Sequence, residues 1–521
     1  MTRIGRLTPL ACAVAALFGA GQASAATLKV CQSGCPYAQL APAVAAAQAG
    51  DKIKIGPGTY AGRVTIDTSV KLVGAGPDAT IISGGGPVLS IGVAGAASEP
   101  TVTIRGVTVT GGAAIGNLAP ESGRGGGIYI PRAAGPSTGA TVTIRDSVIR
   151  GNRTAPATAI ESDDPCCLFA DSGGGGISND GTLTIIDTLI SDNRADDAAG
   201  LASNAIGGGI LNRAYGRLTV KHSVVAHNHV RVSPPNGRFA PGGGIAASGG
   251  TLTITDSRVS DNTADTLSTV PTGVEQEATA GGVQVQGNAS ATIRRTTITG
   301  NAISSTNTLG DAVAFSGGLH ANGRLLLRDS TVTDNTVRAT TAAGSTGTAH
   351  VDSGAGEIDD GTVSNSRFTG NRLTATSSAG EAHAEAGGIM TAAVEGLTIS
   401  HSVIGGNRVA ATTTTGSASL QGGGIENLGV LTLRNTSVSA NAGTASGPSG
   451  FAKGGGILNR SDLPDGPPVT ALTLVNSAIT HNALTASPGI TVRGGGLFTV
   501  FPVTLTHSVI ADNVPDQCYG C

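Results

Sequence analysis

The feature that most constrains this chain is an asparagine that closes a repeated phrase. One copy of the phrase is GGGISNDGTLTIIDTLISDN, at residues 174–193. The closing asparagines are Asn152, Asn193, Asn228, Asn262, Asn301, Asn335, Asn371, Asn407, Asn441, Asn482 and Asn513. Most of them are 34–41 residues apart. Such a period is typical of a solenoid in which each repeat stacks on the one before.

Each asparagine is preceded by fixed residue types. A serine or threonine lies five positions before it and an apolar residue lies three before it, as Thr188 and Ile190 do for Asn193. An aliphatic residue lies eight before it, as Ile185 does. A Gly-Gly-aliphatic sequence lies further upstream in most copies, but the unit near residues 354–356 is degraded and shorter. The phrase therefore reads as two strands followed by a turn.

The alternation in "TLTI" (182–185) predicts a strand with one apolar face. One such strand cannot bury that face alone, so equivalent strands must stack about 4.8 Å apart. Glycine is expected where the chain turns tightly or where a Cβ would clash with the neighbouring coil. The asparagine is expected to adopt the left-handed conformation at a turn, and to hydrogen-bond to its equivalents along the stack.

The composition fits a thin aliphatic core. The chain has 80 glycines, no tryptophan and 2% aromatic residues, while 39% of its residues are apolar. Low charge and few aromatics also occur in disordered chains, but the regular apolar pattern favours a β-rich fold. With a net charge of −3 and scattered Lys and Arg, nothing supports nucleic-acid binding. The scarcity of aromatics argues against a deep saccharide groove.

The first 25 residues have the pattern of a signal peptide. Arg3 and Arg6 precede a short apolar run at residues 10–20, and Ala-Ser-Ala at residues 23–25 matches a cleavage site. The run is too short to span a bilayer, and no later apolar stretch is long enough for a transmembrane segment. We therefore expect a protein that is secreted, extracellular or located at the cell surface.

Cysteines occur near both ends of the mature chain. After the signal segment they are Cys31, Cys35, Cys166, Cys167, Cys518 and Cys521. The pairs in "CQSGC" and "CYGC" are short enough to close locally, and the ends of an elongated fold are too far apart for cross-pairing. We expect disulfides within these two pairs. Strain in a vicinal bridge leaves the pairing of Cys166 and Cys167 open.

The Gly-Gly-aliphatic and x-aliphatic-x-x-Asn elements resemble the repeats of chlamydial polymorphic outer membrane proteins, and "FTGN" at residues 368–371 matches one of their motifs literally. More broadly, the pattern is similar to that of the pectin-lyase-like superfamily. The resemblance implies an all-β fold, a right-handed parallel β-helix solenoid. It also implies a cap and irregular first coils at residues 26–112, with a short N-terminal capping helix near residues 40–49. Repeat coils then fill residues 113–521 and end in a Cys-containing tail.

Variable segments rich in Ala, Thr and Ser separate each asparagine from the next Gly-Gly. They exceed what a minimal coil needs, so we expect them to project as a wall of loops along one side. Such a face is where repeat proteins commonly bind ligands. The alternative is neutral variation on a tolerant scaffold.

The acidic residues of the sequence offer a candidate metal site. Carboxylates are densest at Asp163, Asp164, Asp196 and Asp197, where neighbouring loops could form a Ca²⁺ site. Glu381 and Glu385 are expected to be solvated. No Arg-x-Lys, Gly-His-Gly or Asp-Pro-His-Glu sequence is present, so no residue is assigned as catalytic or cofactor-binding.

These observations favour a non-enzymatic protein that binds or adheres through its loop-lined face. Its ligand would be a polysaccharide or a surface protein. One alternative is a polysaccharide lyase or glycoside hydrolase acting on an acidic polysaccharide. The other is a structural solenoid without a ligand.

Overall fold

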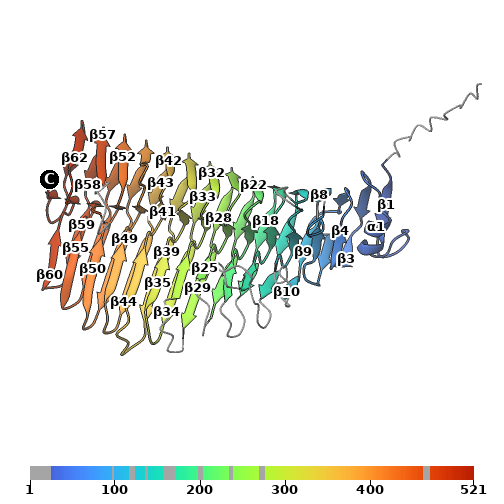
Figure 1. Ribbon diagram of the computed structural model, residues 1–521, viewed down its shortest axis with the longest axis horizontal. Helices are drawn as coiled ribbons and strands as arrows, with labels where there is room; N and C mark the ends of the chain where they lie inside the picture. Colours follow the sequence, from blue (N-terminus) through green and yellow to red (C-terminus); the bar gives the residue numbers. More distant parts are fainter. Residues whose placement is uncertain are drawn as a thin grey trace, which may run out of the picture.

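A computed structural model describes residues 25–96, 99–115, 124–134, 139–155, 170–196, 203–233, 239–268, 276–461 and 470–521. These residues form a right-handed parallel β-helix with a single short helix among them (Figure 1). The predicted fold class is therefore confirmed. No helix of the described residues is long and apolar enough to cross a membrane.

The first coils have three strands each. One coil, for example, consists of β5 (Lys71–Val73), β6 (Thr80–Ser83) and β7 (Leu89–Ile91). These strands belong to three parallel sheets, which we name A, B and C; within the described residues they have 15, 14 and 14 strands. Their inward side chains are aliphatic and form one continuous core along the stack.

Later coils are wider because two further sheets enter between B and C. Sheet D begins at β10 (Ala113–Ile115), and sheet F begins at β25 (Phe239–Pro241). A full coil then has five strands: β37 (Arg324–Arg328) in A, β38 (Thr331–Thr333) in B, β39 (Thr336–Thr341) in D, β40 (Ala349–Asp352) in F and β41 (Gly356–Ile358) in C. The widening toward the C-terminus is visible in Figure 1.

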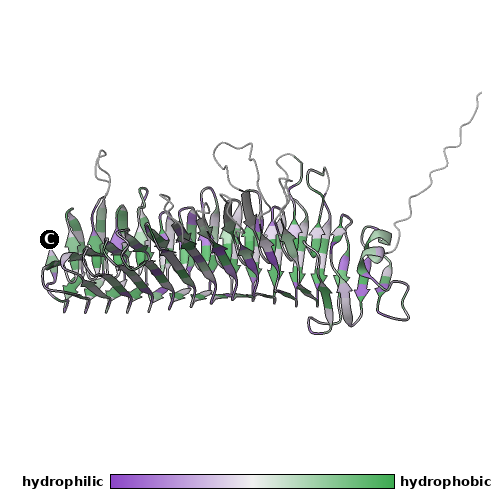
Figure 2. Cartoon of the chain, turned by 90° about the horizontal axis from the view of Figure 1, so that it is seen from below, coloured by the Kyte–Doolittle hydropathy of each residue, from purple (hydrophilic) through white to green (hydrophobic). Residues whose placement is uncertain are grey.

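Much of the sequence expected to project as loops is therefore built into the solenoid. The segment β44 (Arg372–Ser377) reads RLTATS and alternates between exposed and buried positions. Alanine and aliphatic residues from sheets D and F form a second core beside the first. The prediction was wrong for these segments because small Ala, Thr and Ser residues carry a strand pattern of low hydropathy. In Figure 2, apolar stretches recur coil after coil along the stack.

The repeated asparagines form a buried ladder between the two cores. In a typical step, Asn335 donates from its backbone N and from Nδ2 to Asn371 Oδ1, both at 3.0 Å. Asn335 Nδ2 also reaches the carbonyl of Ile298 in the coil before, at 3.3 Å. Such steps connect Asn152 to Asn513 without a break. The predicted hydrogen-bonded ladder is confirmed.

The predicted left-handed conformation of these asparagines is wrong. Positive φ angles occur instead at the residue just before the asparagine, as at Asp192 (φ 56°) and His481 (φ 58°). They also occur six positions before it, as at Asp187 and His222, both at φ 47°. The asparagine itself is buried, and its role is to supply hydrogen bonds in the interior.

The Gly-Gly sequences lie against this ladder. A Cβ on Gly176 would lie 2.9 Å from Asn193 Nδ2, and one on Gly209 would lie 3.0 Å from Asn228 Nδ2. The chain passing from sheet F to sheet C therefore crosses close to the chain passing from B to D. Glycine is needed there because a side chain would displace the asparagine amide.

The two ends of the stack differ. Helix α1 (Leu40–Ala46) covers the first coil with buried Leu40 and Val44, at the place where a capping helix was expected. At the other end, β62 (Val503–Thr506) is largely exposed and β64 (Cys518–Tyr519) pairs with β61 (Leu497–Thr499). The structure contains disulfides between Cys31 and Cys35 and between Cys518 and Cys521.

Candidate functional site

Sheets C and F meet at the Gly-Gly sequences, and their outer faces form a groove. In β40, Ala349 and Val351 point into the second core, so His350 and Asp352 point out. In β41, Ile358 is in the first core and Glu357 points out. A pocket of about 410 Å³ lies where these outer faces meet. It is lined by Ile206, Pro241, Glu277, Thr279, Gln284, Gln286, Phe315, His320, Asn322, Asp352, Glu357 and Met390. We call this feature the F–C groove.

Strand register aligns the groove side chains in columns. On sheet F, His350 pairs with His383 of β45 (Ala382–Glu385), and Asp352 pairs with Glu385. The second column continues to Gln421 of β50 (Ser417–Gln421). On sheet C, one column contains His320, Glu357, Met390 and Glu426. Residues more than 30 positions apart in sequence are thereby brought to neighbouring coils.

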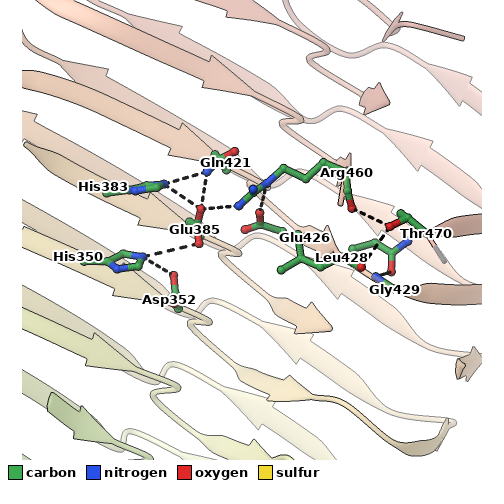
Figure 3. Close-up of polar contacts among 11 residues, drawn as sticks. His350, Asp352, His383, Glu385, Gln421, Glu426, Leu428, Gly429, Arg460 and Thr470 are labelled. Carbon is green, nitrogen blue, oxygen red and sulfur yellow. Dashed lines mark hydrogen bonds and ion pairs between the residues drawn. The ribbon is translucent and has the colours of Figure 1, made fainter. Parts of the chain in front are cut away.

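Six of these side chains, together with Arg460, form what we call the polar cluster (Figure 3). Its members are His350, Asp352, His383, Glu385, Gln421, Glu426 and Arg460. Arg460 follows strand β56 (Ile457–Asn459) of sheet C, so the cluster spans both walls of the groove.

Glu385 is the centre of the polar cluster. Its Oε1 lies 2.8 Å from His383 Nε2 and 3.0 Å from the guanidinium of Arg460. Gln421 also donates to Oε1. The other oxygen, Oε2, lies 3.7 Å from His350 Nε2. The carboxylate is nearly buried, with 6% of its side chain exposed, and is surrounded by donors.

The two histidines are arranged as a pair. Their rings stack with centroids 4.8 Å apart and planes at 20°. Phe315 packs edge-on against His350, with centroids 5.7 Å apart. About a quarter of each imidazole remains exposed, 27% for His350 and 24% for His383. Both rings are thus fixed in the groove wall while keeping contact with solvent.

One buried oxygen of the polar cluster has no partner. Asp352 Oδ1 and His350 Nε2 form an ion pair at 3.1 Å. Glu426 Oε2, in contrast, has no hydrogen-bond partner among the described residues, although Glu426 Oε1 pairs with Arg460 Nε at 2.8 Å. Unpartnered buried polar atoms are uncommon, because each carries an uncompensated desolvation cost.

Burial and neighbouring charges shift the pKa values of the three carboxyl groups in the cluster in different directions. Burial opposes the charged form of His350, but the charges of Asp352 and Glu385 outweigh it and raise its pKa to about 11. Burial raises the pKa of Asp352 to about 6, against the effect of His350. For Glu385, hydrogen bonds and charge from His350 and His383 outweigh burial and hold the pKa well below its ordinary value. Burial and the charge of Glu385 raise the pKa of Glu426 well above its ordinary value.

A smaller polar group lies beside the pocket. His320 Nδ1 is 3.2 Å from Glu357 Oε2 and 3.2 Å from the hydroxyl of Ser316. Burial opposes the charged imidazole, but Glu357, with Asp359 and Glu277 beyond it, outweighs burial and raises the pKa of His320. The pocket wall therefore holds an imidazole whose charged form Glu357 favours.

The C-terminal part of the groove is aromatic and basic. Lys453 lies over the rings of Phe451 and Phe498, 4.3 and 5.2 Å from their centroids. Phe498 and Tyr519 stack with centroids 5.1 Å apart, and Arg493 lies over Tyr519. Burial, Arg460 and Arg493 together lower the pKa of Lys453. Although aromatics are scarce in the chain, several of them are concentrated on this face.

The structure describes only some of the site residues that the sequence predicts. Asp163, Asp164 and Asp197 lie outside the described residues, as do Cys166 and Cys167. Asp196 is in contact with Arg194. Glu385, expected to be solvated, is instead buried at the centre of the polar cluster, and that expectation was wrong.

The cluster could have been found by a different alignment. Counted from the first glycine of each Gly-Gly or, in the degraded unit, of Gly-Ala-Gly, His350 lies four positions before Gly354 and His383 lies four positions before Gly387. Asp352 and Glu385 lie two positions before them. Anchoring on the asparagine hides these columns, because the segments between asparagine and Gly-Gly differ in length.

Comparisons with known proteins find only distant structural similarity. No protein-family model and no curated protein matches the chain. A pectin methylesterase solved with a hexasaccharide aligns at 12% identity and a TM-score of 0.26, covering 54% of this chain and 80% of that one. Two A-modules of Azotobacter vinelandii mannuronan C-5 epimerases align at 13% and 11% identity, with TM-scores of 0.24 and 0.22. They cover 90% and 88% of this chain, and 92% and 86% of their own. The fold assignment rests on the strand pairing itself.

Proposed function

We propose that the protein is an extracellular β-helix protein that binds a linear polysaccharide along the F–C groove. The observation that carries the proposal is the groove wall, where exposed polar side chains such as Gln286 and Asn322 accompany the ring of Phe315. Sugar hydroxyls can bond to such side chains, and sugar rings can lie against aromatic faces. A polymer parallel to the stack would meet a new row of side chains about every 4.8 Å.

This proposal moves the binding face from the expected loop wall to the groove. The basic residues Lys453 and Arg493 at one end favour a polymer that carries some negative charge. An extracellular location is supported by the signal-peptide pattern and by the two disulfides. The likeness of the repeats to those of chlamydial surface proteins agrees with that location.

The experiment is size-exclusion chromatography of acidic and neutral polysaccharides, before and after incubation with the full chain. Intact polymer that co-elutes with the protein supports the proposal. Shortened polymer would instead identify a lyase or hydrolase. Polymer that neither binds nor shortens would contradict both functions and favour a protein ligand or a structural role.

A matched pair of double variants locates the binding face. Phe315→Ala with Gln286→Ala removes one apolar and one polar group from the groove. Leu326→Ala with Thr292→Ala does the same on the outer face of sheet A, in two adjacent coils. We expect only the first pair to weaken binding, by on the order of 10-fold, since lost contacts of this kind are worth about 1–2 kcal/mol together. Equal weakening by both pairs would contradict the groove assignment.

A further inference from the structure

The polar cluster brings three good metal ligands together on two adjacent coils. His350 comes from β40, while His383 and Glu385 come from β45. One ligand atom from each residue lies within 4.8 Å of the other two. Ligands of a tetrahedral Zn²⁺ ion, each about 2.0–2.1 Å from the metal, are about 3.4 Å apart. Modest side-chain rotations would close the set around an ion.

The orientation of the side chains supports a shared centre. Both Nε2 atoms face the same carboxylate, since His383 Nε2 is 2.8 Å from Glu385 Oε1 and His350 Nε2 is 3.7 Å from Oε2 (Figure 3). The imidazoles are held nearly parallel by stacking and by strand register. These side chains are therefore already oriented before an ion binds, so binding costs little conformational entropy.

An independent observation concerns Asp352. Its side chain is only 8% exposed, and Oδ1 forms an ion pair with His350 Nε2 at 3.1 Å. The same Nε2 atom lies 3.7 Å from Glu385 Oε2, so both carboxylates face it. Asp352 thus offers a second carboxylate next to the three residues.

The surrounding residues act as outer partners for such a site. Gln421 and Arg460 both bond to Glu385 Oε1, which leaves Oε2 toward His350. Arg460 is in turn held by the buried Glu426. Outer hydrogen bonds of this kind orient metal ligands and hold them in place. The partly exposed imidazoles leave a path from the groove to the ligand atoms.

We propose that His350, His383 and Glu385, with Asp352 beside them, form a binding site for a divalent transition-metal ion in the F–C groove. Two imidazoles and carboxylates suit Zn²⁺ and its first-row neighbours, whereas Ca²⁺ and Mg²⁺ prefer sets made of oxygen alone. The site is distinct from the Ca²⁺ site expected at residues 163–197, and it does not depend on the proposed polysaccharide.

The test is a titration of the purified, metal-stripped full chain with Zn²⁺, followed by competition with a chromophoric chelator. We expect one tightly bound ion per chain. Co²⁺ in place of Zn²⁺ should give visible absorption typical of a nitrogen- and oxygen-ligated site of low coordination number. Ca²⁺ at the same concentration should not compete. Absence of a stoichiometric ion, or binding of Ca²⁺ in preference to Zn²⁺, would overturn the proposal.

Variants locate the ion. His383→Gln and Glu385→Gln should each weaken Zn²⁺ binding by more than the roughly 10- to 100-fold that loss of an outer partner causes. The matched control is His401→Asn, which removes an exposed histidine from a turn where equivalent coils carry asparagine, as at Asn435. Unchanged binding in a folded His350→Gln/His383→Gln double variant would overturn the assignment. Because no polymer is present, this result is separate from the outcome of the polysaccharide experiment.

Discussion

Two arrays of buried polar side chains occur in this molecule, and they differ in charge, in repetition and in how completely they are hydrogen-bonded. The asparagine ladder is neutral, repeats in each coil from Asn152 to Asn513, and bonds each amide to the next. The polar cluster is charged, is confined to a few coils of sheets C and F, and contains an unpartnered buried oxygen at Glu426. The ladder finds its hydrogen-bond partners within the chain, whereas the polar cluster retains a buried oxygen without a partner among the described residues.

The difference indicates what each array is for. A repeated, fully bonded ladder contributes to stability, because every buried amide finds its partners within the fold. A charged set with unpartnered atoms costs folding free energy unless a ligand compensates for it. The columns of sheet F change from Val313 and Phe315 to His350 and Asp352 within one coil. The position where repetition fails is therefore where we place function.

The largest expected effect comes from breaking the ladder. Asn371→Ala would remove the acceptor of two bonds from Asn335 and leave the carbonyl of Val332 without its donor. Since each unsatisfied buried group costs about 1–3 kcal/mol, we expect a loss of at least about 3 kcal/mol in unfolding free energy. Urea unfolding measures it. Asn476→Asp, at an exposed turn, is the control and should change stability by less than about 0.5 kcal/mol.

A somewhat smaller effect is expected where the glycines meet the ladder. A Cβ on Gly388 would lie 2.6 Å from the carbonyl oxygen of Gly424 and 2.7 Å from a methyl of Ile404. Gly388→Ala should therefore cost about 1–3 kcal/mol through overpacking. Gly406→Asp, at a positive φ with open space around it, should be nearly neutral, as equivalent coils carry Asp there. Similar losses in both variants would mean that flexibility, not close packing, explains the glycines.

The third effect depends on pH. Because Glu357 and its neighbours raise the pKa of His320, the protonated imidazole stabilises the fold. This contribution is complete below about pH 6.5 and is lost as the pH rises through the raised pKa. Glu357→Gln should remove most of it. The stability difference between the wild type and this variant should therefore shrink from about pH 6 to pH 9 in urea unfolding; a difference that grows would contradict the assigned pair.

The smallest effect concerns the two ends of the stack. Replacing Cys518 and Cys521 by serine should loosen the last coil, where β62 is already exposed, without shifting the main unfolding transition. Faster amide exchange at residues 503–511 would report it. The same change at Cys31 and Cys35 should have less effect on its coil, which α1 covers. Free thiols at Cys518 and Cys521 in secreted material, detected by mass spectrometry, would contradict the disulfide between these two residues.

The sequence predicts the parts of the fold that repeat. The ladder and the apolar columns follow from residue types at fixed distances from each asparagine, whereas the capping helix was expected from the N-terminal segment, which does not carry the repeat. The second core does not, because its strands use alanine and threonine, as in β44, and these resemble loop composition. Their low hydropathy conceals the alternation between buried and exposed positions.

The polar cluster was missed for a related reason. His350, His383 and Glu385 are unremarkable one by one, and they lie in segments of variable length. Only strand register shows that His350 adjoins His383 and that Asp352 adjoins Glu385. The pairing with Arg460 depends in addition on how sheets C and F meet, which no local pattern reports.

The most direct test compares His383→Gln with Asn371→Ala in parallel measurements of unfolding free energy and Zn²⁺ affinity. We expect His383→Gln to keep the unfolding free energy within about 1 kcal/mol of the wild type and to lose the ion. We expect Asn371→Ala to lose at least about 3 kcal/mol of unfolding free energy and, while folded, to keep the ion. A His383→Gln variant as unstable as Asn371→Ala, with unchanged Zn²⁺ affinity, would make the polar cluster part of the scaffold and contradict the distinction between the two arrays.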